Sequence, residues 1–397
     1  MSEKQPVLRF IAMSDVHVKD DPSCVELARL RKGLAEGYAY ARSQPYDRID
    51  QIVVIGDFAN NGTEQQMINF KEALYPNLGE ETGVIISTAS HEYGAGEDVA
   101  KERLKRIYGL DPFIHRVVNG FHFISVSSTR GCRFDDAEKA FAADSLKQAF
   151  DDDPRKPVFF FQHPHVSGTV ACGIAWGEDD LIPILVNYPQ IINFSGHSHA
   201  PVNDPRSIHQ KHFTSLGTGT LSYFECEDFD MYYGTVPPTG KEAAQYLVVE
   251  AYADNSVVVK PYDIITGQFF PYVWHIDTPS DPDTFIYTDK RYETSVRPYF
   301  TDKTAKVDLS GDKLRITYPQ ASIDEDRVDY YMITIRRADG VICRRACMYS
   351  DYFMYYMPET LTFELELLPA GEYKAQIKAI SFWGKESADS IDLQFRV

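Results

Sequence analysis

Five short motifs carry carboxylates and imidazoles at close spacing. They are Asp15-Val16-His17, Gly56-Asp57, Ser90-His91-Glu92, His163 and Gly196-His197-Ser198-His199. Asp-x-His and His-x-His each place two donors two residues apart, and this spacing can aim both side chains into one crevice. A mixture of carboxylate oxygen and neutral imidazole nitrogen suits Mn, Fe or Zn better than Ca or Cu(I). The motifs therefore predict a site for divalent transition metal ions.

The donors are numerous enough to hold two ions that share one carboxylate. The two sets are Asp15, His17, His199 and Asp57 for one ion, and Asp57, His163 and His197 for the other. A carboxylate that bridges two ions about 3.5–4 Å apart belongs to the two-metal arrangement used for in-line displacement at phosphorus. Such ions polarise the phosphoryl oxygens and supply a hydroxide near neutral pH. A separate acid, His91, can then protonate the leaving oxygen.

Each motif directly follows an apolar run that has the length of a strand. The runs that predict strands are Leu8–Met13, Ile52–Ile55, Val84–Ser87, His122–Val126, Val158–Phe161 and Ile191–Phe194. They are near-continuously apolar, as is typical of strands buried on both faces. Helical patterns lie between them, near Pro22–Gln44, Thr63–Leu74, Glu97–Tyr108, Asp135–Phe150 and Glu178–Tyr188, with Ser23, Thr63 and Asp135 as N-caps. This alternation predicts an α/β fold, whose ligands bind at the carboxyl ends of the strands.

The last part of the chain has the pattern of a separate all-β domain. Pro, Asp and Thr become frequent between His275 and Lys303, so we place the boundary there. Residues 1–285 are expected to form the first domain, 286–302 a linker and 303–397 the second. Short strands and an Asp339-Gly340 hairpin turn resemble a fibronectin type III module, an immunoglobulin-like sandwich. Tyr373 then matches the tyrosine corner, whose phenol bonds back to the backbone.

The order of the five motifs resembles the calcineurin-like metallophosphoesterase superfamily over roughly residues 7–225. The resemblance implies a four-layer fold, in which a β-sandwich is flanked by helices. It also implies a hydrolase of phosphate mono- or diesters that uses a dinuclear metal centre, with His91 as the catalytic histidine. The metal ligands that it implies are Asp15, His17, Asp57, His163, His197 and His199.

The third motif departs from the family pattern. The family usually has Gly-Asn-His, with the Asn as a ligand of the second metal, whereas this chain has Ala89-Ser90-His91. A serine hydroxyl is shorter than an amide and is a poorer ligand. We therefore expect Ser90 to belong to a second metal site that is weaker, water-filled or occupied only with substrate present. The residue three positions after Asp57 is Asn60 and not Tyr, which argues against the purple acid phosphatase variant with its tyrosine-bound ferric iron.

The roles of four further residues are assigned from their local sequence. His165 follows His163 by two residues, but the ligand usually lies immediately past the strand, so we expect His163 to bind metal and His165 to line the pocket. We interpret Trp176 as a core residue and Arg206 as a solvated arginine after a turn. The sequence assigns no substrate-binding residues.

Composition limits the classes of partner. The 397 residues carry a formal net charge of −18, and so acidic a surface repels nucleic acids and anionic membranes. No nucleic-acid scaffold role is therefore expected. No run of about 18 apolar residues predicts a membrane span. The first residues, MSEKQPVLRF, show no apolar signal segment, so we expect a cytoplasmic protein, although a secreted protein with its signal removed has the same pattern.

Each motif, taken singly, also has an ordinary structural interpretation. Asp15 can cap a helix, Asp57 can belong to a turn, and an isolated His-x-His can be a pair of surface histidines. Together the motifs favour a metal-dependent hydrolase of phosphate esters. The main alternative is a catalytically weakened phosphoesterase fold that binds a ligand or regulates a partner, because Ser90 replaces the usual Asn. The second domain has no catalytic cluster, and we expect it to pack on the first or to bind a protein partner.

Overall fold

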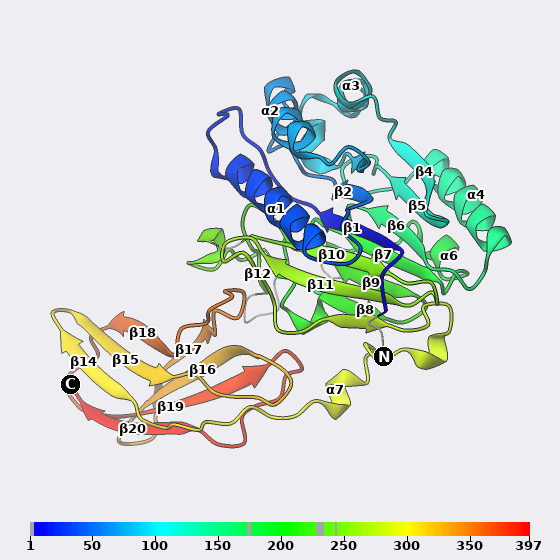
Figure 1. Cartoon of the computed structure of the whole chain (residues 1–397). Coiled ribbons are helices and arrows are strands. Elements are labelled where there is room, and N and C mark those ends of the chain that lie inside the picture. Colours follow the sequence, from blue (N-terminus) through cyan, green and yellow to red (C-terminus); the bar gives the residue numbers. More distant parts are fainter. Residues whose placement is uncertain (1–3, 173–175, 228–233, 243) are drawn as a thin grey trace. The chain divides into compact units, whose positions relative to one another are not determined.

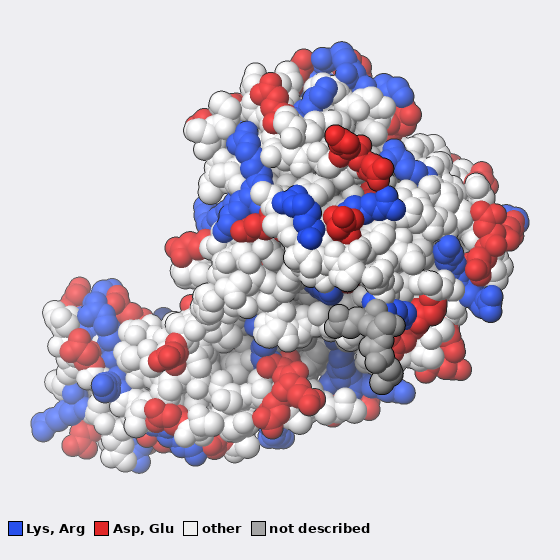
Figure 2. All heavy atoms as spheres, viewed as in Figure 1, with Lys and Arg blue, Asp and Glu red and all other residues white. Residues whose placement is uncertain are grey.

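The computed structural model describes residues 4–172, 176–227, 234–242 and 244–397. The chain divides into two compact units, Met1–Thr288 and Asp289–Val397 (Figure 1). Among the described residues, none of the helices has the length and apolar character needed to cross a membrane. Lys and Arg side chains and Asp and Glu side chains are both spread over the face of the first unit shown in Figure 2.

Two mixed sheets form the centre of the first unit. One sheet has the strand order β12-β11-β10-β1-β2-β3, with β13 paired to β11, and its β1, β2 and β3 are parallel. Its strands are β1 (Leu8–Met13), β2 (Gln51–Ile55), β3 (Gly83–Ser87), β10 (Gln245–Ala251), β11 (Val257–Asp263), β12 (Gln268–Phe269) and β13 (Trp274–Ile276). The other sheet has the order β4-β5-β6-β7-β9-β8, and β5, β6, β7 and β9 are parallel. Its strands are β4 (Phe113–Val118), β5 (Phe121–Val126), β6 (Val158–Gln162), β7 (Ile191–Ser195), β8 (Ile208–Gln210) and β9 (Thr214–Gly217).

Phenylalanine rings fill the space between the two sheets. Phe10 of β1 packs edge-on against Phe123, Phe159 and Phe194 of the second sheet, with ring centroids 4.8–5.6 Å apart. Burial of such rings contributes the largest apolar areas in a core. The strands are therefore buried on both faces, as their continuous apolar runs predicted.

Helices cover the outer faces of both sheets. α1 (Val25–Arg42) and α2 (Glu64–Leu74) bury one apolar side each against the first sheet. α4 (Asp136–Asp152) and the short α6 (Ile182–Leu185) do the same on the second sheet. The layers are thus helix, sheet, sheet, helix, and the prediction of a four-layer sandwich is confirmed. α3 (Glu97–Arg103) continues into a π-helical turn over Leu104–Tyr108.

Three local predictions can be compared with the helix ends. Thr63 caps α2, because its hydroxyl accepts the N–H of Gln66 at 3.2 Å. Ser23 is not a cap: Cys24 occupies that position, and the Ser23 hydroxyl donates to Asp21 instead. The helix expected over residues 178–188 shrinks to α6, because Pro183 has no N–H and is tolerated only in the first helical turn.

The second unit is a β-sandwich of two antiparallel sheets. One sheet has the order β14-β15-β18 and the other β17-β16-β19-β20. The strands are β14 (Lys306–Ser310), β15 (Lys313–Pro319), β16 (Val328–Arg337), β17 (Ile342–Tyr349), β18 (Thr360–Glu366), β19 (Glu372–Ser381) and β20 (Ile391–Arg396), and the short helix α7 (Arg291–Thr294) precedes them. The Tyr373 hydroxyl donates to the carbonyl of Pro369 at 2.7 Å, which is the bond expected of a tyrosine corner. The sandwich is confirmed, and its assignment to the fibronectin type III class stays a prediction.

Candidate metal centre

The loops after five parallel strands meet at one end of the first unit. β1, β2 and β3 of the first sheet and β6 and β7 of the second all end there, and each is followed by one of the five motifs. Hydrogen bonds between backbones join the loops: the N–H of His17 donates to the carbonyl of Asp57 at 3.1 Å, and that of Gly196 donates to His163 at 3.0 Å. The topology therefore brings together side chains that lie up to 184 positions apart in the sequence.

The first group consists of Asp15, His17 and His199, whose ligand atoms all lie within 4.8 Å of one another. The Nε2 atoms of the two histidines are 3.1 Å apart, and Oδ1 of Asp15 is 3.2 Å from Nε2 of His199. Nδ1 of His199 donates to the carbonyl of Tyr223 at 2.8 Å, so that its Nε2 carries the lone pair that points into the group. All three side chains are buried.

The second group consists of Asp57, His163 and His197. Nε2 of His163 lies 2.9 Å from Oδ2 of Asp57, while its Nδ1 donates to the carbonyl of Ile55 at 2.6 Å. Ser90 lies in this group as well, because its hydroxyl donates to Oδ2 of Asp57 at 3.1 Å. Asp57 thus faces the residues of the second group and, through His17 and His91, borders the first.

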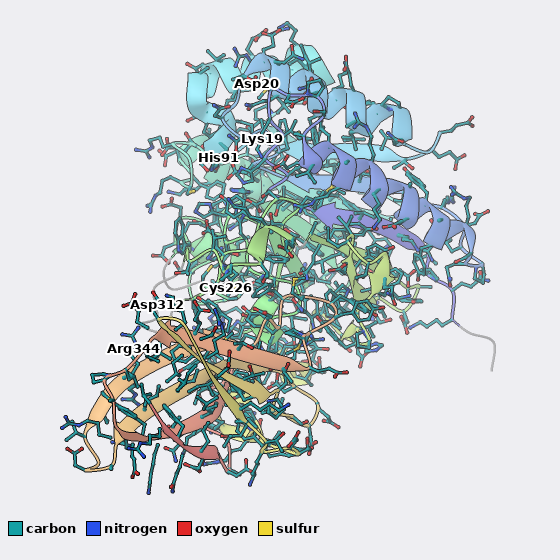
Figure 3. All side chains as sticks on the ribbon, turned by 90° about the vertical axis from the view of Figure 1, so that its left-hand side faces the viewer. Lys19, Asp20, His91, Cys226, Asp312 and Arg344 are labelled. Atoms are coloured by element: carbon teal, nitrogen blue, oxygen red, sulfur yellow. The ribbon has the colours of Figure 1, made fainter. Side chains whose placement is uncertain are left out.

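His91, labelled in Figure 3, lies in the short 3-10 helix Ser90–Ala95 that follows β3. Its backbone N–H donates to Oδ1 of Asp57 at 2.9 Å, and its ring packs edge-on against His17 with centroids 4.4 Å apart. Nδ1 donates to the carbonyl of Asn60 at 2.6 Å, which leaves Nε2 for contacts in the pocket. Unlike Asp15 and His163, His91 is only partly buried.

The backbone at this end of the sheets is strained. Five of the residues in the two groups have a positive φ, between 50° and 67°: Asp15, His17, Asp57, His197 and His199. This left-handed region disfavours every residue with a Cβ, at about 1–2 kcal/mol for each one, although Asp and His enter it more often than most. Strain of this kind persists only where surrounding contacts over-determine the backbone, and it concentrates at functional sites.

Burial and neighbouring charges set opposite protonation preferences within the site. Burial alone would raise the pKa of Asp15, but His199, His163 and His17 hold that pKa well below its ordinary value. Burial lowers the pKa of His163, yet the carboxylates of Asp57 and Asp15 raise it to about 10. Burial and the neighbouring imidazoles lower the pKa of His197 to about 3. The site therefore combines two carboxylate anions with at least one neutral imidazole.

The donor set fits divalent cations. Among the residues that the structure describes, Oδ1 of Asp15 is buried and has no hydrogen-bond partner. Three imidazole Nε2 atoms surround it: those of His199 at 3.2 Å, and of His17 and His163 at 3.8 Å each. An unpaired buried carboxylate oxygen is costly, and a cation held between it and neutral imidazoles removes the cost. Carboxylate and imidazole together suit Mn, Fe or Zn.

The model of the calcineurin-like phosphoesterase family matches residues 8–201. Residues 8–201 therefore belong to the calcineurin-like phosphoesterases. This range contains all five motifs and both groups of candidate ligands. No curated protein matches the sequence.

Solved structures resemble the chain only distantly. Purple acid phosphatase PPD1 from yellow lupin (Lupinus luteus) seeds is 13% identical, with a TM-score of 0.48, over 68% of this chain and 53% of that one. Vps29 from Chaetomium thermophilum is 8% identical, with a TM-score of 0.31, over 68% of this chain and 95% of that one. The chain thus spans about half the length of the lupin protein. Similarity at this level carries no argument about activity.

Glu92 is a residue of the candidate metal centre to which the sequence assigned no role. Its buried carboxylate accepts three backbone N–H groups: that of Ala59 at 2.8 Å on Oε1, and those of Ala89 at 2.9 Å and Asp57 at 3.0 Å on Oε2. These donors belong to the loops after β2 and β3. Glu92 therefore fixes Asp57 relative to His91. A glutamate directly after a candidate catalytic histidine is the only signal that the sequence offers for it.

Two other interpretations are wrong. Trp176 is not a core residue: 39% of its surface is exposed, and its ring lies 5.2 Å from that of His197. Arg206 is not solvated, because its guanidinium pairs with Asp204 at 2.8 Å and with Glu227 at 2.7 Å. The Asp204 pair is local, but the contacts of Arg206 with Glu227 and of Trp176 with His197 join residues 21 positions apart, which local pattern does not reveal.

Proposed function

We propose that the first unit hydrolyses phosphate mono- or diesters with a dinuclear metal centre and a catalytic histidine. Membership of residues 8–201 in the calcineurin-like phosphoesterases supports a metal-dependent hydrolase. The observation that supports the finer proposal is a pair of ligand groups, one of Asp15, His17 and His199 and one of Asp57, His163 and His197. Asp57 connects them, because it also forms a group with His17 and His91.

Each of the two groups would bind one metal ion. Asp15, His17 and His199 would hold the first ion, His163 and His197 would hold the second, and the Asp57 carboxylate would be shared by both. When bound, divalent ions of Mn, Fe or Zn act as Lewis acids toward the phosphoryl group and offset its negative charge. Fixed Nδ1 hydrogen bonds, from His163 to Ile55 and from His199 to Tyr223, hold both rings with Nε2 turned inward.

His91 holds the proton for the leaving group. Its Nδ1–H is committed to the carbonyl of Asn60, so Nε2 is the atom that meets the substrate. Because the ring is also fixed against His17, it can give a proton to an ester oxygen without first reorienting. A positioned general acid contributes about 10²–10⁴-fold to rate.

The open side of the site is where the substrate enters. Asp15, Asp57 and His163 are buried, whereas Ser90, His91 and His197 are partly exposed. The charged side chains of Asp15, Asp57 and His163 are therefore shielded from bulk water. The partly exposed residues are the ones that face the ester.

Ser90 supports the second candidate function, a binding protein of weakened activity. Its hydroxyl points at Asp57, in the position where the family has an amide ligand. A serine adds one short, neutral oxygen, which leaves the second ion with fewer strong ligands. If the second ion is lost, the remaining site recognises a ligand without turning it over.

Metal analysis combined with hydrolysis assays separates the two functions. Protein purified without chelator is analysed for metals, and hydrolysis of bis-p-nitrophenyl phosphate and p-nitrophenyl phosphate is measured with added Mn, Zn or Fe. The variants are Asp57→Asn, His91→Ala and Ser90→Asn, with the exposed Asp111→Asn as a control for loss of a carboxylate.

We expect the wild type to hydrolyse the esters. Asp57→Asn should lose this activity with its fold intact, and His91→Ala should show a large fall in the rate of hydrolysis. Full activity in Asp57→Asn contradicts the bridging role. One metal ion or fewer per chain, with activity appearing only in Ser90→Asn, establishes the binding protein instead.

A further inference from the structure

A groove of about 200 Å³ crosses the outer face of the four-stranded sheet of the second unit, opposite the core. It is lined by Met332, Thr334, Arg336, Ile342, Arg345, Gln376, Lys378 and Glu386, and we call it the basic groove. These residues come from β16, β17, β19 and the segment after β19. Three of the eight are cationic and one is acidic, in a chain whose formal net charge is −18. The groove therefore concentrates positive charge on an otherwise acidic protein.

The register of the strands sets the spacing of the two arginines. Arg345 of β17 is paired with Thr334 of β16, and Arg336 lies two positions further along β16. Residues two apart on a strand point to the same face and are separated by about 6.6 Å. The two arginine side chains therefore start from neighbouring rows of the sheet, at the repeat distance of an extended chain.

The contacts of both guanidinium groups within the second unit are weak. Nε and Nη2 of Arg345 donate to the sulfur of Met332 at 3.3 and 2.9 Å, and a thioether is a poor acceptor. Nη1 of Arg336 reaches the carbonyl of Gly340 only at 3.5 Å, beyond the usual range of an N–H···O hydrogen bond. Most of the donor capacity of the two side chains is therefore directed at solvent.

Ion pairs of the second unit involve other cations. They join Lys303 to Asp389, Lys313 and Arg315 to Glu364, Arg337 to Asp339, and Lys378 to Glu386. The charge of Lys378 is thus offset within the groove. Over the described residues of this unit, the charges of Arg336 and Arg345 have no carboxylate beside them, so an anionic ligand can supply one.

The other walls of the groove favour carboxylates over phosphates. Guanidinium groups pair with both kinds of anion, but Glu386 opposes a doubly charged phosphate more strongly than it opposes single carboxylates. The net charge of −18 also repels nucleic acids and anionic membranes. Met332 and the exposed Ile342 offer an apolar surface to the aliphatic part of a glutamate. We infer that the basic groove binds an extended acidic peptide segment of a protein partner, in which carboxylates two positions apart pair with Arg336 and Arg345.

Fluorescence anisotropy with two labelled octapeptides and the full chain tests the spacing. One peptide alternates threonine and glutamate, so that an extended backbone presents all its carboxylates on one face. The other has four glutamates followed by four threonines, and therefore the same composition and charge. We expect saturable binding of the alternating peptide at low ionic strength, about threefold tighter than that of the block peptide and weaker in added salt. Peptide binding at this groove is independent of the proposed phosphoesterase function.

Variants of neighbouring residues test the place of binding. Arg336→Gln and Arg345→Gln should each weaken binding of the alternating peptide about two- to fivefold, the range of exposed ion pairs. Arg344, labelled in Figure 3, is the matched control: it is paired with Ile335, which lies in the core, so its side chain starts from the opposite face. Arg344→Gln removes the same charge and should leave binding nearly unchanged. Glu386→Gln should tighten binding, a direction that damage to the fold does not produce.

The outcomes that overturn the inference are distinct. Absence of saturable binding, or equal affinity for the alternating and block peptides, contradicts an extended acidic ligand. Equal weakening in Arg344→Gln and Arg345→Gln shows that net charge alone attracts the peptide. Tighter binding of oligothymidylate or of phosphatidylserine vesicles than of the alternating peptide, with the same loss in Arg345→Gln, assigns the groove to another polyanion and refutes the peptide.

Discussion

Replacement of Glu92 by Gln tests how the metal centre is held together. The Glu92 carboxylate is buried and accepts only backbone N–H groups, one of them from Asp57, so its substitution leaves the ligand side chains themselves unchanged. Gln has almost the same shape but offers one acceptor oxygen and one NH₂ donor group. Any effect on metal binding therefore arises through the loops that carry Asp57 and His91.

The magnitude follows from the three hydrogen bonds. If the remaining oxygen takes the place of Oε2, it keeps the bonds from Asp57 and Ala89, and the N–H of Ala59 then faces another donor. One buried donor left unsatisfied costs about 1–3 kcal/mol. For a domain of this size each kcal/mol lowers Tm by about 2–4 °C. Loss of a residue that supports a ligand typically weakens metal affinity about 10- to 100-fold.

The assay compares Glu92→Gln with Glu138→Gln. Glu138 is also buried, and its Oε2 accepts the N–H of Asp135 at 3.1 Å at the start of α4, away from the site. We expect thermal unfolding to show comparable losses of stability in both variants, and Mn or Zn titration to show weakened binding only in Glu92→Gln. Unchanged metal affinity in Glu92→Gln, or equal weakening in both variants, refutes the positioning role.

Three further predictions concern backbone conformation and pH. Gly56 and Gly109 have φ of +72° and +73°, but a Cβ on Gly56 would lie 2.7 Å from Nδ1 of His163 while one on Gly109 meets nothing within 4 Å. Gly109→Ala should lose about 1 kcal/mol in thermal unfolding through backbone strain alone, whereas Gly56→Ala should lose more because its Cβ also collides with His163. Only Gly56→Ala should also lose metal in titration, and equal metal binding in both variants contradicts the packing argument. His17 has a φ of +51°, which Gly adopts without the cost that Ala has there. In metal-free protein His17→Gly should therefore be about 1 kcal/mol more stable than His17→Ala. Equal melting temperatures of the two variants exclude backbone strain at this position. Burial raises the pKa of Glu178 from 4.5 to about 7. Between these two pH values the native state keeps a proton that the unfolded chain releases. The free energy of unfolding therefore falls by up to about 3 kcal/mol as the pH rises from 4.5 to 7. Urea unfolding at pH 5 and pH 8 should show that Glu178→Gln lacks this loss, and a wild type without it contradicts the raised pKa.

The central strands of the first unit were predictable from sequence. All six predicted strands, such as Ile52–Ile55 against the observed Gln51–Ile55, lie within one residue of their observed bounds. Their continuous apolar runs record burial on both faces, which the stacked sheets impose. β4, Phe113–Val118, has no such run because it lies at a sheet edge, and its residues are only partly buried or exposed. Edge position is a tertiary property, and the sequence does not mark it.

The positions of the candidate ligands were also predictable, since each follows a predicted strand and parallel strands bring their carboxyl ends together. Their backbone conformation was not. Nothing in Asp-x-His distinguishes a left-handed aspartate from one that caps a helix, because the φ of Asp15 is set by partners from residues 56 and 220–222. The place of Trp176 was missed for the same reason: its ring comes to lie 5.2 Å from that of His197 only after both segments have folded over the strand ends.

The strained backbone links the stability of the first unit to its site. Five left-handed residues at about 1 kcal/mol each amount to a sizeable part of the 5–15 kcal/mol that usually stabilises a folded domain. The hydrogen bonds of the surrounding loops must supply that energy: Asp15 alone accepts bonds at its carbonyl from Thr220, Leu221 and Ser222. These same bonds hold residues 220–222 against Asp15, so the packing of this segment and the shape of the metal centre depend on each other. A substitution that loosens this segment should therefore weaken metal binding even where it removes no ligand.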